Sequence, residues 1–403
     1  MDQLTIESIW KQLCWKRYQI SSQKPKSVLI VVDNLRIGGI QRLAVDECYS
    51  LNKKGIEHLL VSLSVFEENN SMVKVDQEFT EISQLNLKYL GGGKLRQLIE
   101  LTKLMKQDFN LIVTHSATAT LLLRIAVTLK MKKINIILYI HQLISLSSNR
   151  QALKRFIYFI FANKLFVSSN QFKLEIESYL ESKWWGALFR KKIYFDRMGI
   201  YLDRVDNQPK SHICSETMPH LIFSSRMTEW KGFQVFLNLS SKFNSENHKI
   251  VFEITKMKNK RNDIHDLNAD DNHLFYSKSP VSFKYPLKSL HIYPTSYGDL
   301  IQFPQSIGMN VLELLALGVP SLISIEGFQS WPELQRSVLI ETCDWSDPTE
   351  VDNKMKKLLN VDQSSARDES IKIRDSISIE RHVANLISQM ISENKYRLLS
   401  RIK

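Results

Sequence analysis

Residues 305–320 read QSIGMNVLELLALGVP and set out a loop, a helix and the approach to a strand. Valine and leucine recur from Val311 to Leu317 as in a buried helix, and Gly318, with a proline beyond it, marks the helix end. The start of the helix, near Gly308, leaves backbone N–H groups unpaired, which suits a phosphate. Glu313 is expected in the first turn. There it can accept hydrogen bonds from hydroxyls beside a phosphate, or simply complement the dipole of a core helix.

A strand, a glycine-containing turn and a helix follow one another between residues 28 and 52. Val28 to Val32 is a continuous apolar run of the kind found in central parallel strands. Residues 40–52 have the pattern of an amphipathic helix, and residues 59–65 form the next expected strand, so the unit predicts a Rossmann-like sheet. Gly39 opens the helix, where the missing Cβ allows either the approach of a ligand or a plain tight turn.

Length and composition favour an ordinary globular chain of more than one domain. With 403 residues, 43% of them hydrophobic and 24% charged, two domains are the simplest division. No apolar run reaches the roughly 18 residues of a membrane span, and the N-terminus lacks the apolar core of a signal peptide. The four cysteines have no motif spacing and are expected to be free thiols in a reducing cytosol.

The net charge of +12 is placed unevenly along the chain. Residues 1–205 hold 30 Lys and Arg against 18 Asp and Glu, whereas residues 206–403 hold 24 of each, so the whole excess lies in the N-terminal half. This distribution predicts an anionic partner for that half. No zinc-finger, RNP or GxxG signature accompanies the charge, so nucleic acid is not the expected partner.

The stretch 305–320 resembles the donor-site segment of retaining GT-B glycosyltransferases of glycosyltransferase family 4, which usually reads E-G-F-G-x-x-x-x-E-A-x-A-x-G-x-P. The positions that match are Gly308, Glu313, Ala316, Gly318 and Pro320. Gln305 stands where the family has its first Glu, and the preceding loop, residues 295–304, is longer than in the family. The resemblance implies an α/β protein of GT-B architecture, with two Rossmann-like domains facing across a cleft.

A second family segment, G-R-l-x-x-x-K-G, is matched by Arg226, Lys231 and Gly232, with Ser225 in place of the first glycine. A diphosphate leaving group needs cations that neutralise its developing charge, and an Arg fork with a Lys point charge supplies them without a metal. A solvated basic turn is the competing interpretation. The position of this segment after a strand favours the diphosphate site.

Weaker matches lie in the N-terminal half. Gly38, Gly39 and Arg42 match the G-G-x-x-R/K turn of the family. His141, after the apolar run 134–140, resembles the His that faces the donor sugar, and His115 resembles another His at a strand end. A His in such a position is also commonly a structural residue.

The resemblance implies retaining transfer of a sugar from a nucleotide-sugar donor to an acceptor hydroxyl. The positive charge of the N-terminal half favours an acceptor on a lipid-linked or cell-envelope polysaccharide precursor. The implied donor-binding residues are Gly39, Arg226, Lys231, Gly308, Met309, Asn310 and Glu313. His141 and Gln305 would be the catalytic residues beside the sugar, and no metal or other cofactor is expected. The alternative is a non-catalytic GT-B module that binds a partner glycosyltransferase or a glycan, because Gln305 and the long loop depart from the family pattern.

The resemblance also implies a division of the chain. Residues 1–26 would form an N-terminal extension, and residues 27–205 the acceptor-side domain, on which the helix 379–403 packs back. Residues 206–378 would form the domain that binds the nucleotide-sugar.

Aromatic and basic side chains lie together late in the N-terminal half. These residues are Trp184, Trp185, Arg190, Lys191 and Lys192. Trp favours the headgroup layer of a membrane, and Lys and Arg are attracted to anionic lipids. The segment therefore predicts peripheral docking at the inner face of the cell membrane, unless the aromatic rings are core and the cations a solvated face.

Overall fold

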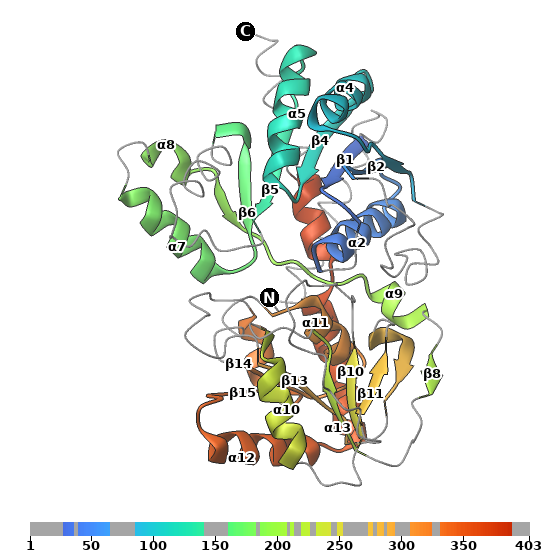
Figure 1. Ribbon diagram of the computed structural model, residues 1–403, viewed down its shortest axis with the longest axis vertical. Coiled ribbons are helices and arrows are strands. Elements are labelled where there is room, and N and C mark those ends of the chain that lie inside the picture. The colour runs from blue at the N-terminus through green and yellow to red at the C-terminus, as the bar shows by residue number, and fades with distance from the viewer. Residues whose placement is uncertain are drawn as a thin grey trace, which may run out of the picture.

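The computed structural model shows two α/β units, one above the other in Figure 1. The structure describes residues 27–35, 39–64, 85–140, 160–182, 186–207, 210–212, 219–225, 231–242, 248–252, 273–276, 280–285, 288–294, 307–324 and 331–388. The predicted N-terminal extension lies outside these ranges.

The N-terminal sheet is parallel, and its described strands lie in the order β3-β2-β1-β4-β5-β6-β7. The strands are β1 (Ser27–Val32), β2 (His58–Ser62), β3 (Leu87–Tyr89), β4 (Phe109–Thr114), β5 (Asn135–Ile140), β6 (Lys164–Val167) and β7 (Ile193–Phe195). The helices are α2 (Gly39–Lys53), α4 (Lys94–Leu104), α5 (Ala117–Leu129), α7 (Asn170–Glu181) and α8 (Ala187–Arg190), followed by α9 (Leu202–Asn207). The chain reverses its direction across the sheet between β1 and β4, which is the Rossmann-like pattern that the sequence predicted.

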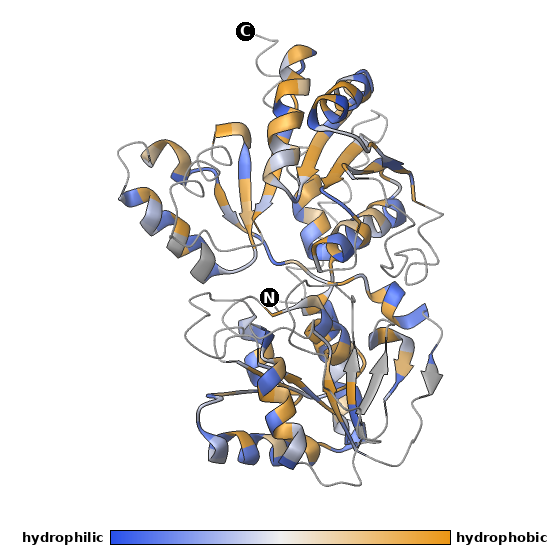
Figure 2. Ribbon diagram, viewed as in Figure 1, coloured by the Kyte–Doolittle hydropathy of each residue, from blue (hydrophilic) through white to orange (hydrophobic). Residues whose placement is uncertain are grey.

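The two faces of this sheet are covered by different helices. Along β1, Val28, Ile30 and Val32 pack with α2, whereas Leu29 and Val31 point to the opposite face and pack with α4 and α5. Such alternation follows from the period of two in a strand. Figure 2 shows apolar strands between helices whose outer surfaces are hydrophilic.

The C-terminal sheet is also parallel, with its described strands in the order β11-β10-β9-β13-β14-β15. The strands are β9 (His220–Phe223), β10 (His248–Phe252), β11 (His273–Tyr276), β13 (Leu290–Tyr293), β14 (Ser321–Ser324) and β15 (Ile340–Cys343), and β8 (Ser211–His212) pairs with β12 (Phe283–Lys284) apart from them. The helices are α10 (Phe233–Lys242), α11 (Met309–Ala316), α12 (Pro348–Leu359) and α13 (Gln363–Ile377), with short 3-10 turns η3 (Pro280–Ser282) and η5 (Pro332–Arg336). Helices α11 and α13 pack on one face, and α10 and α12 on the other.

Within the described residues, the chain crosses between the two units at two adjacent points. Ile200 pairs with Ser378 in a parallel bridge, and its N–H donates to the carbonyl of Ile377 at 2.9 Å. A Cβ at Gly199 would lie 2.4 Å from the Ser378 carbonyl carbon, so only glycine allows the two crossings to touch. Residues 380–388 then form a helix on the N-terminal sheet, next to α2.

A buried polar network fastens this returning helix. His382 shares hydrogen bonds of 2.8 Å with Glu47 of α2 and with Asp196, which follows β7. Tyr139 donates to the same Asp196 at 2.9 Å. Although burial opposes protonation, the two carboxylates raise the pKa of His382 to about 10, so both ring nitrogens donate at neutral pH. Despite burial, the partner histidines lower the pKa of Glu47 to about 2.

The predicted elements agree with the structure over β1, α2, β5 and α11, and differ at the strand that follows α2. The strand expected at 59–65 ends at Ser62, after which the chain bends. Helix α12 begins at Pro348, because the side chain of Asp347 caps it by accepting from the N–H groups of Thr349 and Glu350. Helix α13 was not predicted, since its polar sequence carries few apolar positions.

We expect His382→Gln to destabilise the protein most below neutral pH. The raised pKa means that the stabilisation is fully present below the unfolded value near 6.5 and is lost as pH rises toward 10. Breaking the buried pairs should cost about 3–5 kcal/mol at pH 6. Thermal melting from pH 6 to pH 10 should show that the melting temperature of the variant lies below that of the wild type by a difference that narrows steadily as pH rises.

The matched control is His58→Gln, because burial lowers the pKa of His58 and its loss should not produce this trend. A deficit for His382→Gln that stays the same at every pH would contradict the charged state of this histidine.

Candidate functional site

The carboxyl ends of β9 and β13 mark the point where the strand order of the C-terminal sheet reverses. Open α/β sheets bind ligands in the crevice at such a point. Ser224 and Ser225 follow β9, and Pro294 follows β13. Gly232 and Gly308, from the two segments that the sequence singled out, both lie at this edge, next to Pro294 and Tyr293.

Helix α11 points its N-terminus toward this edge of the sheet. Gly308 precedes the helix in an extended conformation and provides no side chain to cap it. A Cβ at Gly308 would lie 2.5 Å from the hydroxyl of Tyr293, so a larger residue does not fit without displacement. The N–H groups at Met309 and Asn310 are therefore well placed for an anion.

The Asn310 side chain ties α11 to the sheet edge. Its Nδ2 donates to the carbonyl of Ser224 at 2.9 Å and to the Oγ of Ser224 at 2.7 Å. That hydroxyl also shares a hydrogen bond of 2.6 Å with His291 of β13, which in turn contacts Ser321 of β14. Burial lowers the pKa of His291 to about 3, so the ring is neutral. The network aligns β9, β13 and β14 beneath the helix end.

Lys231 supplies positive charge from the turn that leads into α10. Its Nζ lies 3.5 Å from the hydroxyl of Tyr293 and 5.6 Å from the centre of that ring. The next residue, Gly232, has φ +72°, and a Cβ there would lie 2.3 Å from the carbonyl oxygen of Pro294. Glycine is thus required for the turn to approach β13 closely, which explains the Lys-Gly pair of the motif.

Glu313 occupies a different place from the one expected. Helix α11 begins at Met309, so Glu313 falls in the second turn rather than the first. Its carboxylate is completely buried and accepts hydrogen bonds from Arg42 at 2.8 Å and from Arg204 at 2.7 Å. Contact between Glu313 and a ribose therefore remains a prediction that requires these arginines to release the carboxylate.

Several predicted site residues lie outside the described ranges. These are Arg226, His141, Gln305, Trp184 and Trp185. Gly39 is described, and it opens α2 at the surface, with free space where a Cβ would stand. Arg42 follows one turn later, so its bond to Glu313 brings the start of α2 near α11 across the two units (Figure 1).

His115 belongs to the core rather than to an open site. Its side chain is completely buried, its Nε2 lies 3.1 Å from a carboxylate oxygen of Glu47, and its ring stacks on Tyr139 with centroids 5.2 Å apart. It therefore joins the network around His382. The structural interpretation of this strand-end histidine is the one that the contacts support.

The basic segment near α8 is partly engaged within the protein. Arg190 pairs with Glu181 at 2.9 Å, and Lys192 donates to the carbonyl of Ala162 at 3.1 Å and lies 5.0 Å from the ring centre of Phe189. Lys191 is exposed. Docking of this segment on a membrane remains a prediction, and Arg190 and Lys192 have partners within the protein.

Two functional candidates were missed from the sequence, Asp46 and Arg204. Asp46 is fully buried and accepts two hydrogen bonds from Arg204, at 2.9 and 3.0 Å. The signal was present: Asp46 and Glu47 stand between apolar residues on the inner face of the helix 40–52. Carboxylates in such positions are buried only with partners.

Two further features concern metals and membranes. Among the residues that the structure describes, no group of three or more His, Cys, Asp or Glu side chains is arranged to hold a metal ion. Within the same residues, we find no helix with the length and apolar character to span a bilayer.

Comparison with known proteins gives no match to a family model and none to a curated protein. Solved structures do match. HepE of Anabaena in complex with UDP has a TM-score of 0.65 at 10% identity, covering 91% of this chain and 100% of its own. A glycosyltransferase of Rickettsia africae ESF-5 has a TM-score of 0.64 at 14% identity, over 91% and 98% of the two chains. An alpha-glucosyltransferase in complex with UDP and DNA containing an HMU base has a TM-score of 0.61 at 13% identity, covering 91% of this chain and 100% of its own.

The fold is GT-B. Two parallel α/β sheets and the near-complete coverage of these structures confirm the architecture that the sequence predicted. In this GT-B fold the candidate site lies at the carboxyl edge of the C-terminal sheet, and the start of α2 faces it from the other unit.

We expect Asn310→Ala to lower stability by about 1–3 kcal/mol, because Ser224 loses a buried donor. Asn310→Asp should lower stability more than Asn310→Ala does. A carboxylate cannot donate to the Ser224 carbonyl, and its negative charge would face the carbonyl oxygen. Urea unfolding of both variants measures the effect.

Asn238→Ala, on the exposed side of α10, is the control and should be close to neutral. Equal stability of the Ala and Asp variants at position 310 would contradict the assigned donor role.

Proposed function

We propose that the protein transfers a sugar from a nucleotide-sugar donor to an acceptor hydroxyl, with retention at the anomeric carbon. The observation that carries this proposal is the open N-terminus of α11 beside Lys231, at the strand reversal of a GT-B sheet. A helix end and a cation at a ligand-binding crevice suit a diphosphate. UDP is the first nucleotide to test, because HepE and the alpha-glucosyltransferase were solved in complex with it.

The donor diphosphate would lie between the helix end and the cations. Backbone N–H groups from Gly308 to Asn310 would donate to its oxygens, and Lys231 with Arg226 would neutralise the charge that develops on the leaving group. Gly39, at the start of α2, would face the donor from the other unit, since no atom lies within 4 Å of a Cβ placed there. No metal is needed in this scheme, and we expect activity to persist in EDTA.

His141 and Gln305 are the proposed contacts of the sugar ring. In a retaining transfer of this kind the acceptor hydroxyl attacks on the face from which the diphosphate leaves. Orientation and electrostatic stabilisation then do most of the work, so a protein carboxylate at position 305 is not required. A Gln amide still donates and accepts hydrogen bonds with sugar hydroxyls.

We expect Lys231→Ala to weaken UDP binding at least about tenfold, since a charge-assisted contact to phosphate contributes about 1.5–3 kcal/mol. Isothermal titration of UDP measures the loss. Lys242→Ala, in the exposed last turn of α10, should bind UDP as the wild type does.

Unchanged affinity in Lys231→Ala would remove this lysine from the site. If the wild type binds UDP while mass spectrometry with UDP-sugars and envelope glycolipids detects no transfer, the alternative of a non-catalytic GT-B module, binding a partner glycosyltransferase or a glycan, is the better account.

We also propose that the acceptor is lipid-linked and that the N-terminal unit docks on an anionic membrane surface at the cytoplasmic side. Exposed large apolar side chains concentrate in this unit. On α4, Leu95 is 73% and Ile99 48% exposed, and in the turn after α5 Met131 is 92% exposed. The turn lies beside the end of α4, because Lys132 donates to the carbonyl of Gln107 at 2.7 Å.

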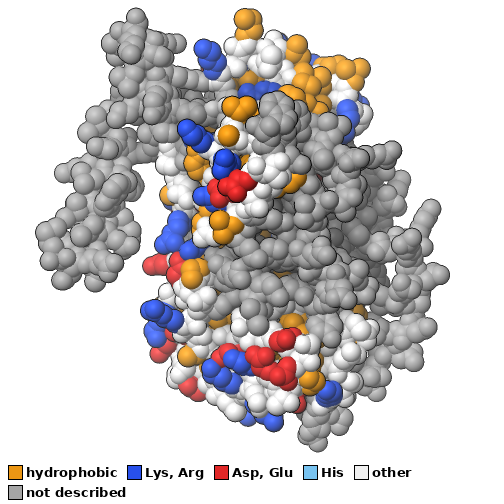
Figure 3. All heavy atoms as spheres, turned by 90° about the vertical axis from the view of Figure 1, so that its left-hand side faces the viewer, with side chains coloured by type: hydrophobic (Ala, Val, Ile, Leu, Met, Phe, Trp, Pro, Cys, Tyr) orange, Lys and Arg blue, Asp and Glu red, His pale blue; other side chains and the backbone are white. Residues whose placement is uncertain are grey.

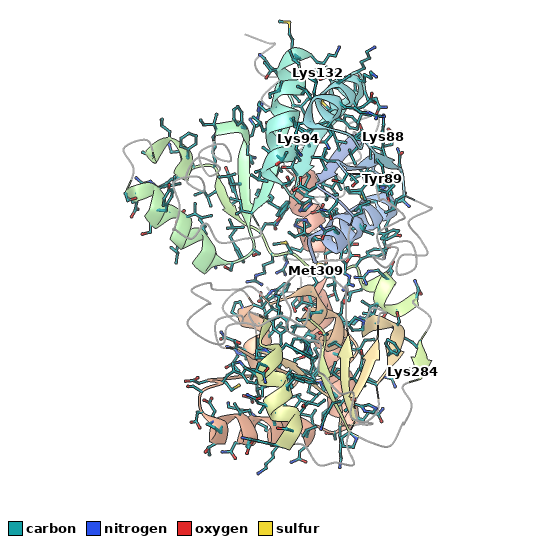
Figure 4. The ribbon with its side chains drawn as sticks, in the orientation of Figure 1. Lys88, Tyr89, Lys94, Lys132, Lys284 and Met309 are labelled. Atoms are coloured by element: carbon teal, nitrogen blue, oxygen red, sulfur yellow. The ribbon has the colours of Figure 1, made fainter. Side chains whose placement is uncertain are left out.

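Cations surround these apolar side chains. Residues 85–108 and 129–134 carry eight Lys and Arg against two acids, Glu100 and Asp108. Both acids are paired with lysines. Figure 4 labels Lys94, the first residue of α4, Lys88 of β3 and Lys132 just past the end of α5. Figure 3 shows Lys and Arg side chains among apolar ones on the neighbouring side of the molecule. Apolar insertion together with lysine attraction is the usual basis of peripheral docking.

We expect replacement of Leu95, Ile99 and Met131 by serine to reduce co-sedimentation with phosphatidylglycerol-containing vesicles at low salt by at least about tenfold. The matched control replaces Val338 and Ile371, which are 49% and 58% exposed in the C-terminal unit, and should bind as wild type does. Equal binding of both variants would contradict docking through α4. Loss only when Arg190, Lys191 and Lys192 are replaced would move the surface to α8.

A further inference from the structure

Four charged side chains are buried together where the two units meet. They are Arg42 and Asp46 of α2, Arg204 of α9 and Glu313 of α11. Each carboxylate is completely buried, and each arginine side chain is 6% exposed. The group contains two positive and two negative charges, so it is neutral as a whole.

All four carboxylate oxygens accept hydrogen bonds. Glu313 accepts from Arg42 at 2.8 Å through one oxygen and from Arg204 at 2.7 Å through the other. Asp46 accepts from Arg204 at 2.9 and 3.0 Å, and also from the backbone N–H of Tyr201 at 3.1 Å. Arg204 thus bridges the carboxylate of one unit to that of the other.

An apolar contact supports the same junction. Met309, the first residue of α11, packs against the core of the N-terminal unit and the core of its own unit. Figure 4 shows Met309 between the two units, at the end of α11 that faces α2. The helix end proposed to bind phosphate is therefore fixed by Met309 at its start and by Glu313 one turn later.

We infer that Glu313 is a positioning residue, which holds the N-terminus of α11 against the other unit through Arg42 and Arg204, and not a contact of the donor ribose. The part of this inference that concerns nucleotide binding rests on the proposed function. The reason is access: the Glu313 carboxylate has no exposed surface while Arg42 and Arg204 hold it, so a ribose hydroxyl does not reach it in this arrangement. Arg42 then acts on the donor site from the opposite domain without touching the donor.

The charge balance makes the inference testable by a double-mutant cycle. Glu313→Gln leaves the group with a net positive charge, and Arg42→Gln leaves it with a net negative charge. The double variant is neutral again, because Arg204 and Asp46 remain paired. Coupled buried charges are strongly non-additive, so the double variant should melt at a higher temperature than the sum of the single losses predicts.

Nucleotide affinity distinguishes a ribose contact from a positioning role. UDP and 2′,3′-dideoxy-UDP are titrated into wild type, Glu313→Gln and Arg42→Gln. We expect both variants to bind both nucleotides at least about tenfold more weakly, with the ratio of the two affinities unchanged. The double variant should bind UDP more tightly than either single variant. If Glu313 and Arg42 served only overall stability, replacing both would not restore nucleotide affinity in the folded protein.

A ribose contact gives the opposite result. Glu313→Gln would then weaken UDP but not the dideoxy nucleotide, and Arg42→Gln would leave both affinities unchanged; either outcome overturns the inference. The control is Asp203→Asn, which removes an exposed ion pair with Lys53 between the same two helices, α2 and α9. It should alter neither melting nor binding.

The melting cycle also separates the two proposals. A wild type that binds no nucleotide refutes the proposed function, while non-additive melting in the same protein still establishes the coupling of Arg42 with Glu313. Additive melting losses overturn the positioning role whether or not UDP binds.

Discussion

A carboxylate removed from water needs a positive partner, and this protein places its buried carboxylates where separate pieces of chain must be joined. Glu313 and Asp46 are held by Arg204 and Arg42 between the two units, and Glu47 is held by His382 where the returning helix meets the N-terminal sheet. Because removing one partner leaves another charge unpaired in a low dielectric, each group tolerates few alternative arrangements. The apolar cores hold the sheets together, whereas the ion pairs determine how the pieces meet.

The candidate site depends on this arrangement. Its chemistry is simple: a helix end, a lysine and a glycine turn at the reversal point of a parallel sheet. Such groups are effective only if they are fixed before a ligand arrives, since preorganised dipoles need no rearrangement during the reaction. Asn310 fixes the helix to its own sheet, and Glu313 fixes it to the opposite unit.

The sequence predicted what depends on local pattern. The apolar run 28–32, the Gly318 helix end and the Lys231-Gly232 turn each carry their signal within a few residues, and the GT-B fold followed from their resemblance to a known family. The role of Glu313 was different, because its partners lie 271 and 109 positions away in the chain and no local pattern announces them. Helix α13 was not predicted for a simpler reason: its exposed face is broad and its apolar positions are few.

The double crossing at Ile200 and Ser378 has a consequence for synthesis on the ribosome. All described strands of the N-terminal sheet have been made by residue 195, yet the helix of residues 380–388 that packs on this sheet comes much later. Until then Glu47 and Asp196 lack His382, and the apolar face beside α2 has no cover from Val383 and Leu386. The first domain to emerge is thus the last to be finished, and among the described residues the carboxylates of Glu47 and Asp196 have only His115 and Tyr139 as partners until the second domain has been translated.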